Sequence, residues 1–429
     1  MVNGRRWLIL IFALYFLFAV GYSLLMPIWE APDEPAHYHL AWHLATYDEY
    51  PSDEISYEAH QPRAFYILGS WVIRALNEVD PELTRYQRPK EYPFTIRQPE
   101  RRFDWTDENY RFLWGVYLLR WLNITFGAIA LWLNWKAFKQ IVPLSLALAA
   151  LAFTALIPQY LHIMSSINND VLGTLAGALL FYLAIRFLKE PSVWMGLLLI
   201  GLAILLPLVT KLTVLPVSAA LLVILTWKWF FDFPQKRWLF YSGFLVVLSA
   251  GIFYLLFPEA VHSAWNEVQW RLFSLRKNAL TAKYLKDISS QIIWTYWGKV
   301  GWLAVGLPLR IIQLLTALGV IGMILQVFFL IRSRVGGVQL GFWLATWLVA
   351  VFTLLAVSRN GLTTFATQGR LLFPAVGALS LLMVAGWHNM LPSQIQRQLP
   401  LIVIVLFLFC NLLLWLIGVL PIYYQPFFD

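Results

Sequence analysis

The sequence predicts an all-α polytopic membrane protein with about eleven transmembrane helices and a long first extracytoplasmic loop. Mean hydropathy is +0.64, and 60% of the residues are hydrophobic while only 13% are charged. Apolar runs near 20 residues recur along the chain, with Trp and Tyr clustered near their ends. Runs of this length cross a bilayer as helices, because every backbone polar group must be satisfied internally. We therefore expect a single integral membrane domain over residues 1–429.

The apolar runs give the expected spans. Their bounds are 7–26, 112–135, 143–161, 169–188, 193–210, 212–231, 238–257, 309–331, 338–357, 371–387 and 400–420. The first run follows Arg5 and Arg6 and could pass for a signal peptide. It is long and no Ala-x-Ala pattern follows it, which favours an uncleaved first span.

Basic residues in the short connections predict the orientation, because Lys and Arg concentrate in cytoplasmic loops. With a cytoplasmic N-terminus, twelve fall inside and three outside. The inside set is Arg5, Arg6, Lys136, Lys139, Arg186, Lys189, Lys228, Lys236, Arg237, Arg332, Arg334 and Arg397. The outside set is Lys211, Arg359 and Arg370. We expect the N-terminus in the cytoplasm and the C-terminus outside.

Charge and cysteine usage exclude several function classes. The net charge is +9, but the basic residues flank apolar runs instead of forming a soluble patch, which argues against nucleic-acid binding. Cys410 is the single cysteine, so disulfide scaffolds and cysteine metal sites are excluded. We find no glycine-rich phosphate loop, no serine nucleophile elbow and no internal repeat.

Two long loops are expected outside, at 27–111 and 258–308. The first holds 16 of the 23 acidic residues, and loops of this length are usually functional or independently structured. Residues 34–46 and 61–77 are predicted to form short amphipathic helices along the outer membrane face. Residues 78–111, rich in Pro and charge, are expected to form an irregular flap.

Residues 30–62 form an acidic, histidine-rich island directly after the first span, with eight carboxylates and four of the seven histidines. Asp33, Glu34 and His37 would lie within one turn of each other at the start of a helix. They could provide a general base or a divalent metal site. Alternatively, the acids cap a helix N-terminus. For His39 and His43, spaced as metal ligands, an aromatic interfacial role is favoured.

Charged residues at the edges of other spans are further candidates. Asp170 lies in a short outside turn, where an acid is costly unless partnered; a helix N-cap is the alternative. Arg120 lies inside the second span, so it must snorkel, pair or bind an anion. Together with Lys211, Arg359 and Arg370 it could bind a lipid phosphate. Pairing of Arg120 with Asp170 or Glu34 is equally compatible with the sequence.

Four ordered motifs resemble the GT-C superfamily of polytopic glycosyltransferases, especially bacterial relatives of protein O-mannosyltransferases and aminoarabinose transferases. They are Pro32-Asp33-Glu34-Pro35-Ala36-His37, His60-Gln61-Pro62, Asn168-Asn169-Asp170 and Gln368-Gly369-Arg370 with Pro374. Trp297-Gly298-x-x-Gly301-Trp302 is a softer match. Together the motifs cover most of the chain in the expected order.

The resemblance implies a lipid-phosphate-linked sugar donor used on the outer face, and two loop helices lying on the membrane. It implies a catalytic acid at Asp33 or Glu34, a second acid at Asp170, and contact of Lys211 with lipid phosphate. This chain departs from the family pattern at Arg63, where the family has a bulky residue after His-x-Pro. The difference concerns the acceptor side of the site. No large soluble C-terminal domain is visible, which argues against oligosaccharyltransferase activity.

We therefore hypothesise inverting sugar transfer from a polyprenyl-phosphate donor to an envelope glycan, lipid or protein hydroxyl, at the bacterial cytoplasmic membrane. The predicted catalytic residues are Asp33, Glu34 and Asp170. Predicted substrate and phosphate ligands are His37, His60, Gln61, Arg120, Lys211, Arg359, Gln368 and Arg370. A divalent cation (Mg, Mn or Zn) could be held by Asp33, Glu34, His37 and Asp170. The alternatives are a flippase of lipid-linked sugars, an O-antigen-ligase-like enzyme that uses a polyprenyl diphosphate, and a non-catalytic assembly protein.

Overall fold

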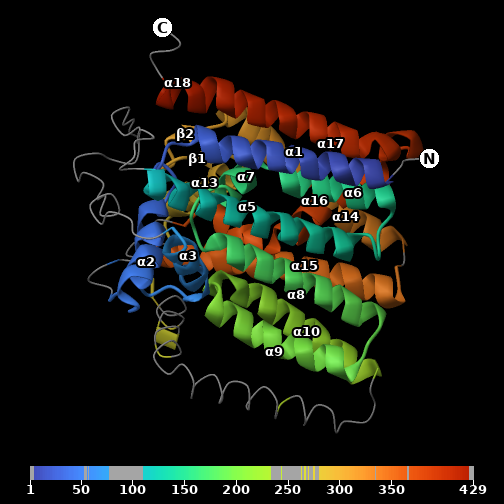
Figure 1. The fold of residues 1–429 in the computed structure, drawn as a ribbon. Helices are drawn as coiled ribbons and strands as arrows, with labels where there is room; N and C mark the ends of the chain where they lie inside the picture. Colours follow the sequence, from blue (N-terminus) through green and yellow to red (C-terminus); the bar gives the residue numbers. More distant parts are fainter. Residues whose placement is uncertain are drawn as a thin grey trace.

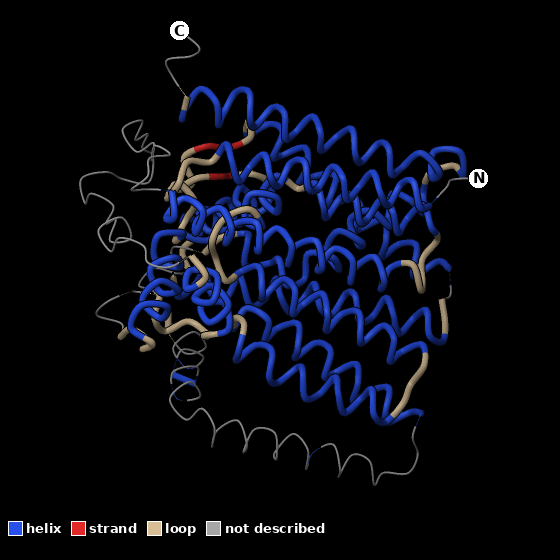
Figure 2. Tube along the Cα trace, in the orientation of Figure 1, coloured by secondary structure: helices blue, strands red, loops and turns tan. Residues whose placement is uncertain are grey.

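The computed structural model describes residues 4–52, 56, 58–76, 110–232, 280–333, 335–364 and 367–424, with a few isolated residues between 233 and 279. Within them the chain is almost entirely helical (Figures 1 and 2). One antiparallel hairpin joins β1 (Lys299–Val300) to β2 (Val305–Gly306) and pairs Val300 with Val305. The all-α polytopic class predicted from hydropathy is confirmed.

In the described residues, seven helical segments are long and apolar enough to cross a membrane, or up to eight if one bent pair is a single span. Five are single helices: α1 (Gly4–Leu25), α5 (Tyr110–Phe138), α8 (Asp170–Lys189), α14 (Leu309–Ser333) and α15 (Gly337–Thr363). The sixth joins the 3-10 helix η3 (Gly369–Ala375) to α16 (Val376–Met390). The seventh joins α17 (Ser393–Leu414), the π turn η4 (Trp415–Val419) and α18 (Leu420–Tyr423).

The remaining expected spans differ in detail. Residues 143–161 form a pair bent by 61°, α6 (Leu144–Leu156) and α7 (Pro158–Met164), because a proline cannot continue a helix and the residue before it leaves the α region. Around Lys211 lie the shorter α9 (Val193–Val209), η2 (Leu212–Val214) and α10 (Leu215–Asp232). The expected span 238–257 and nearly all of the expected flap 78–111 lie outside the described residues.

Both predicted loop helices are present, as α2 (Glu34–Tyr47) and α3 (Ala64–Arg74). They pack against each other at the end of the helix bundle where α1 finishes (Figure 1). The hairpin and α13 (Ala282–Trp297), from the second expected loop, lie at the same end. Among the described residues, α1 begins at one end of the bundle and α18 lies at the other (Figure 1).

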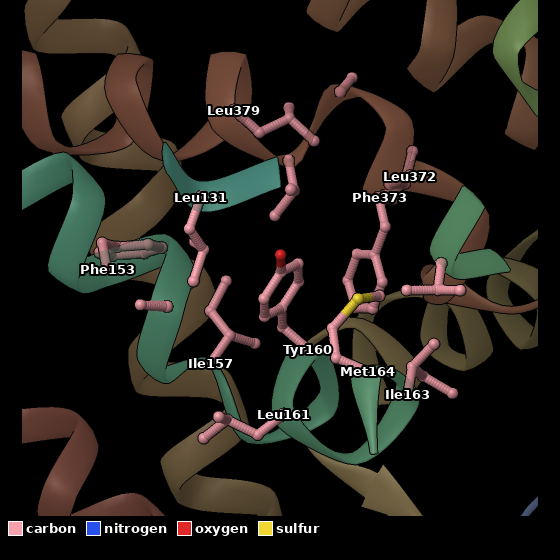
Figure 3. Packing of buried hydrophobic residues seen from close by; sticks show 14 of the residues in the cluster. Leu131, Phe153, Ile157, Tyr160, Leu161, Ile163, Met164, Leu372, Phe373 and Leu379 are labelled. Atoms are coloured by element: carbon pink, nitrogen blue, oxygen red, sulfur yellow. The ribbon is translucent and has the colours of Figure 1, made fainter. Parts of the chain in front are cut away.

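The centre of the bundle is α6, whose residues from Leu146 to Leu156 are all buried. It packs against α1, α16 and α17. Five of its thirteen residues are alanines, and small residues allow close helix approach where apolar burial provides little driving force. Beyond the bend, Tyr160 lies between Leu131, Ile157 and Phe373 (Figure 3). Its hydroxyl donates to the Gly127 carbonyl at 3.1 Å, so this buried polar group is satisfied.

Two glycines bring η3 into the bundle end. A Cβ at Gly177 of α8 would collide with the Pro374 carbonyl, and one at Gly369 would collide with the backbone of α13 at Ile292 and Tyr296. The Gly369 N–H donates to Thr295 Oγ1 at 2.6 Å. These close approaches hold η3 between α8 and α13, which places Arg370 beside the start of α8.

Candidate active site

Asp33 occupies the N-cap position of α2 but does not cap it. Its side chain makes no capping hydrogen bond, and its backbone is left-handed with φ of 64°. Positive φ is uncommon outside glycine, and such conformations cluster at functional sites. Asp33 Oδ2 instead lies 2.6 Å from Arg370 Nη2. The alternative that Asp33 is a helix cap is therefore only partly correct. Asp33 is the N-cap residue of α2, but its side chain binds Arg370 instead of capping the helix.

Arg370 joins three of the sequence motifs. Its second terminal nitrogen, Nη1, lies 3.4 Å from Asp170 Oδ2. The side chain is only 10% exposed. One guanidinium thus bridges acids from the first loop and from the start of α8, which are far apart in the sequence.

Lys211 completes this network from the break between α9 and η2. Its ammonium lies 2.7 Å from Asp170 Oδ1 and donates to Asn169 Oδ1 at 2.6 Å. The Asn169 amide in turn donates to Gln61 Oε1 at 3.2 Å. Lys211, Asp170, Asn169 and Gln61 are therefore connected in one chain of polar contacts. Asp170 is the first residue of α8, whose N-cap is Asn169.

Glu34 and Arg120, both predicted as site residues, are paired with each other. Their side chains are 0% exposed, and Arg120 Nη2 lies 2.7 Å from Glu34 Oε2. Glu34 also accepts from the backbone N–H groups of Trp29 and Ile167. Arg120 donates to the carbonyls of Ser23, Met26 and Pro27. The hydrogen bonds and charges of Glu34 and Arg120 are thus satisfied within the protein. Neither residue lines the cavity at this end of the bundle.

His37 acts as a neutral hydrogen-bonding group. Its Nδ1 lies 2.9 Å from the Tyr66 hydroxyl, and the two rings are stacked. Burial lowers the pKa of His37 to about 3, so the imidazole is uncharged near neutral pH. It can orient a bound hydroxyl but carries no charge for a phosphate.

A cavity of about 550 Å³ opens at this end of the bundle. Its polar wall is formed by Asp33, His37, Glu58, His60, Gln61, Lys211, Arg359, Asn360 and Arg370. Its apolar wall comes from η2, α10 and α15 through Leu212, Leu215, Pro216, Ala219, Phe352, Ala356 and Val357. A group that is charged at one end and aliphatic along its length would match both walls.

The charges in the cavity set the state of its acids. Burial raises the pKa of the Asp33 carboxyl, but the Arg370 and Lys211 cations outweigh burial and hold the pKa below its ordinary value. Asp33 is therefore ionised at neutral pH. An ionised carboxylate that lines a cavity can accept a proton or a hydrogen bond from a bound hydroxyl.

Glu58 was missed by the sequence analysis. It lines the same cavity, and burial, with repulsion from Asp33, raises its pKa to about 7. A signal existed: Glu58 lies in the acidic island and two residues before His60. Nothing in the local pattern, however, distinguishes it from the other acids of the island.

The other predicted ligands are scattered around the cavity. His60 and Gln61 line it and contact each other at 3.2 Å. Arg359 lines it and donates to the Ser274 carbonyl at 3.0 Å. Gln368 is the N-cap of η3 and is not among the lining residues. Arg63, the departure from the family pattern, places its guanidinium 4.5 Å from the centre of the Tyr50 ring.

The donor set does not fit a divalent cation well. No group of three His, Cys, Asp or Glu side chains placed to hold a metal is found among the described residues. Of the four predicted ligands, Asp33, Glu34 and Asp170 each face an arginine or lysine, and His37 contacts Tyr66.

The fold was compared with those of known proteins. No family profile and no curated protein matches the sequence. Among solved structures, ArnT from Cupriavidus metallidurans bound to undecaprenyl phosphate matches 98% of this chain and 74% of its own, at 13% identity and a TM-score of 0.52.

The apo state of the same ArnT matches 92% of this chain and 62% of its own, with a TM-score of 0.50. An apo oligosaccharyltransferase from Archaeoglobus fulgidus matches 95% of this chain and 55% of its own, at 13% identity and a TM-score of 0.47. Identities this low concern the fold alone. The chain shares the all-α polytopic fold of ArnT.

Proposed function

We propose that the protein transfers a sugar from a polyprenyl-phosphate donor to a hydroxyl acceptor on the extracytoplasmic side of the membrane. One observation carries this proposal: acids and cations from separate motifs meet at the polar wall of a cavity whose other wall is apolar. The polar wall matches a sugar phosphate and a hydroxyl, and the apolar wall matches a polyprenyl chain. The fold shared with ArnT supports the same class of activity.

On the acceptor side, Asp33 is the proposed base. It is ionised, lines the cavity and is held by Arg370. As the acceptor oxygen attacks the anomeric carbon, its proton passes to Asp33 and the bond from that carbon to the phosphate oxygen breaks. A single displacement of this kind inverts the anomeric configuration. Asp170, tied to Lys211 and Arg370, positions the two cations.

On the donor side, Lys211, Arg359 and Arg370 line the cavity from three separate parts of the chain. The leaving phosphate gains negative charge as the glycosidic bond breaks. Cations already in place stabilise that charge without reorganisation at the moment of reaction. We assign these three residues to the phosphate, and assign Arg120 and Glu34 to the support of the site.

Replacing Lys211 with methionine is expected to lower kcat/KM for the lipid donor by a factor on the order of 10²–10³, as loss of one preorganised charge-stabilising group does. Steady-state transfer with varied donor lipid measures this effect. Lys189→Met is the matched control, because Lys189 is exposed at the opposite end of α8. Equal losses in the two variants would contradict the assignment of Lys211 to the phosphate.

The function is tested with purified protein in liposomes supplied with polyprenyl-phosphate sugars, polyprenyl-diphosphate sugars and a hydroxyl acceptor. We expect glycosylated acceptor and polyprenyl phosphate as products, and mass spectrometry of the lipid that co-purifies with the protein should identify the donor. Consumption of the diphosphate donor alone would support the ligase-like alternative. Movement of donor across the bilayer without consumption would support a flippase. Absence of both transfer and movement would support the non-catalytic assembly role.

A further inference from the structure

Glu58 is the cavity acid to which the proposed reaction gives no role. It lies in a short turn after α2, where the Gln61 N–H donates to the Glu58 carbonyl at 3.0 Å. Gln61 is itself anchored to Asn169 at the start of α8 and accepts from the Tyr50 hydroxyl on its carbonyl at 3.4 Å. The turn is therefore fixed to the wall of the cavity, and it presents Glu58 among the site residues.

The two carboxyls that line this cavity differ in their partners. Asp33 is bound to Arg370 at 2.6 Å. The Glu58 carboxylate makes no hydrogen bond or ion pair with another residue in the described part of the chain. A half-buried carboxyl without a partner is costly to keep ionised, so it holds a proton more readily than one beside a cation.

We propose that Glu58 is a second proton-transfer residue of this site, which receives from Asp33 the proton that the acceptor hydroxyl loses. This inference rests on the proposed glycosyl transfer. The proton moves from the acceptor oxygen to Asp33 as the new glycosidic bond forms, and the electron pair of the broken bond leaves with the phosphate. Asp33, beside Arg370, then gives the proton to Glu58, which releases it to solvent and is ionised again for the next cycle.

The pKa values of the pair agree with this direction of transfer. The pKa of Asp33 lies below its ordinary value, so a proton on Asp33 is readily given up. Burial and the negative charges of Asp33 and Asp170 raise the pKa of Glu58 to about 7, near the pH at which a proton-transfer group works best. Two carboxyls whose surroundings separate their pKa values are typical of sites that divide proton-transfer roles.

Several charged and titratable groups surround Glu58, and its titration must be distinguished from theirs. They are Asp33 before α2, His37 on α2, His60 in the same turn, Tyr66 on α3, Asp170 on α8, Lys211 before η2, Arg359 on α15 and Arg370 on η3. His37 has a pKa of about 3 and does not titrate near neutral pH. His60 lines the same cavity, so its replacement serves as the control for Glu58.

The test is the pH profile of transfer by the full-length protein in liposomes. Glu58 must be ionised to take a proton, so wild-type kcat should rise through a midpoint near the pKa of Glu58. Glu58→Gln should lower kcat by a factor on the order of 10², the low end for a proton-transfer group, and should lose the rise. Donor-lipid binding, measured separately, should be unchanged, and His60→Gln should keep the rise.

Glu58→Asp restores a carboxyl and covers the case in which Glu58→Gln does not fold. It should recover transfer, with a midpoint moved to lower pH because the ordinary pKa of aspartate is lower than that of glutamate. A wild-type profile in Glu58→Gln, or a wild-type midpoint in Glu58→Asp, overturns the proposal while transfer itself stands. Absence of transfer by the wild type with every donor overturns the proposed function, and this inference with it.

Discussion

Replacing Asp33 with asparagine is expected to lower sugar transfer by a factor on the order of 10²–10⁴, the range that a positioned proton-transfer group contributes. Asparagine has nearly the same shape, tolerates the left-handed backbone at φ of 64°, and can still accept a hydrogen bond from Arg370. It cannot take a proton from the acceptor hydroxyl. The loss should therefore appear in kcat, with folding and donor binding retained.

Asp48→Asn is the matched control. Asp48 ends the same helix, has the same left-handed backbone with φ of 57°, and also pairs with an arginine, Arg74. Its side chain is 85% exposed and lies outside the cavity lining. The control should transfer sugar at the wild-type rate. Undiminished transfer by Asp33→Asn, at wild-type protein levels in the membrane, would rule out Asp33 as the base.

Replacing Arg120 with glutamine is expected to destabilise the protein by about 3–5 kcal/mol, because removal of one partner leaves a buried charge uncompensated. Glu34 would keep two backbone donors but lose its cation. The carbonyls of Ser23, Met26 and Pro27 would lose their common donor. The turn that leads from α1 to Asp33 should loosen, so transfer should fall together with the denaturation midpoint in detergent.

Arg74→Gln is the control for this second experiment, since Arg74 forms the exposed pair with Asp48. Exposed pairs contribute about 0–1 kcal/mol, so its midpoint should move little. The double variant Glu34→Gln with Arg120→Met removes both charges and should recover part of the stability. If Arg120→Gln denatured at the wild-type midpoint, the structural role assigned to the pair would be wrong.

The helices of this protein could be predicted because their signals are local. The expected span at 371–387 lies within η3 and α16, and the loop helices expected at 34–46 and 61–77 are α2 and α3. The bend at Pro158 was missed, although proline is a local signal, because hydropathy alone does not separate a bent span from a straight one.

The candidate site could be predicted only in part. The motifs singled out Asp33, Asp170, Lys211 and Arg370, which the structure brings together. The same pattern placed Arg120 with the phosphate ligands and passed over Glu58. Local sequence does not show whether a charged side chain such as Arg120 or Glu58 faces a cavity or a buried partner.

The sequence by itself therefore determined the membrane class, the positions of most spans and the motifs from which a site could be built, because apolar run length and turn chemistry depend on neighbouring residues. The tertiary structure alone decided which charges pair. Glu34 pairs with Arg120 of α5, and Asp33 pairs with Arg370 of η3, because both elements pack beside the start of α2. Such contacts depend on helix packing, and this packing left Asp33 and Glu58 as the cavity carboxyls.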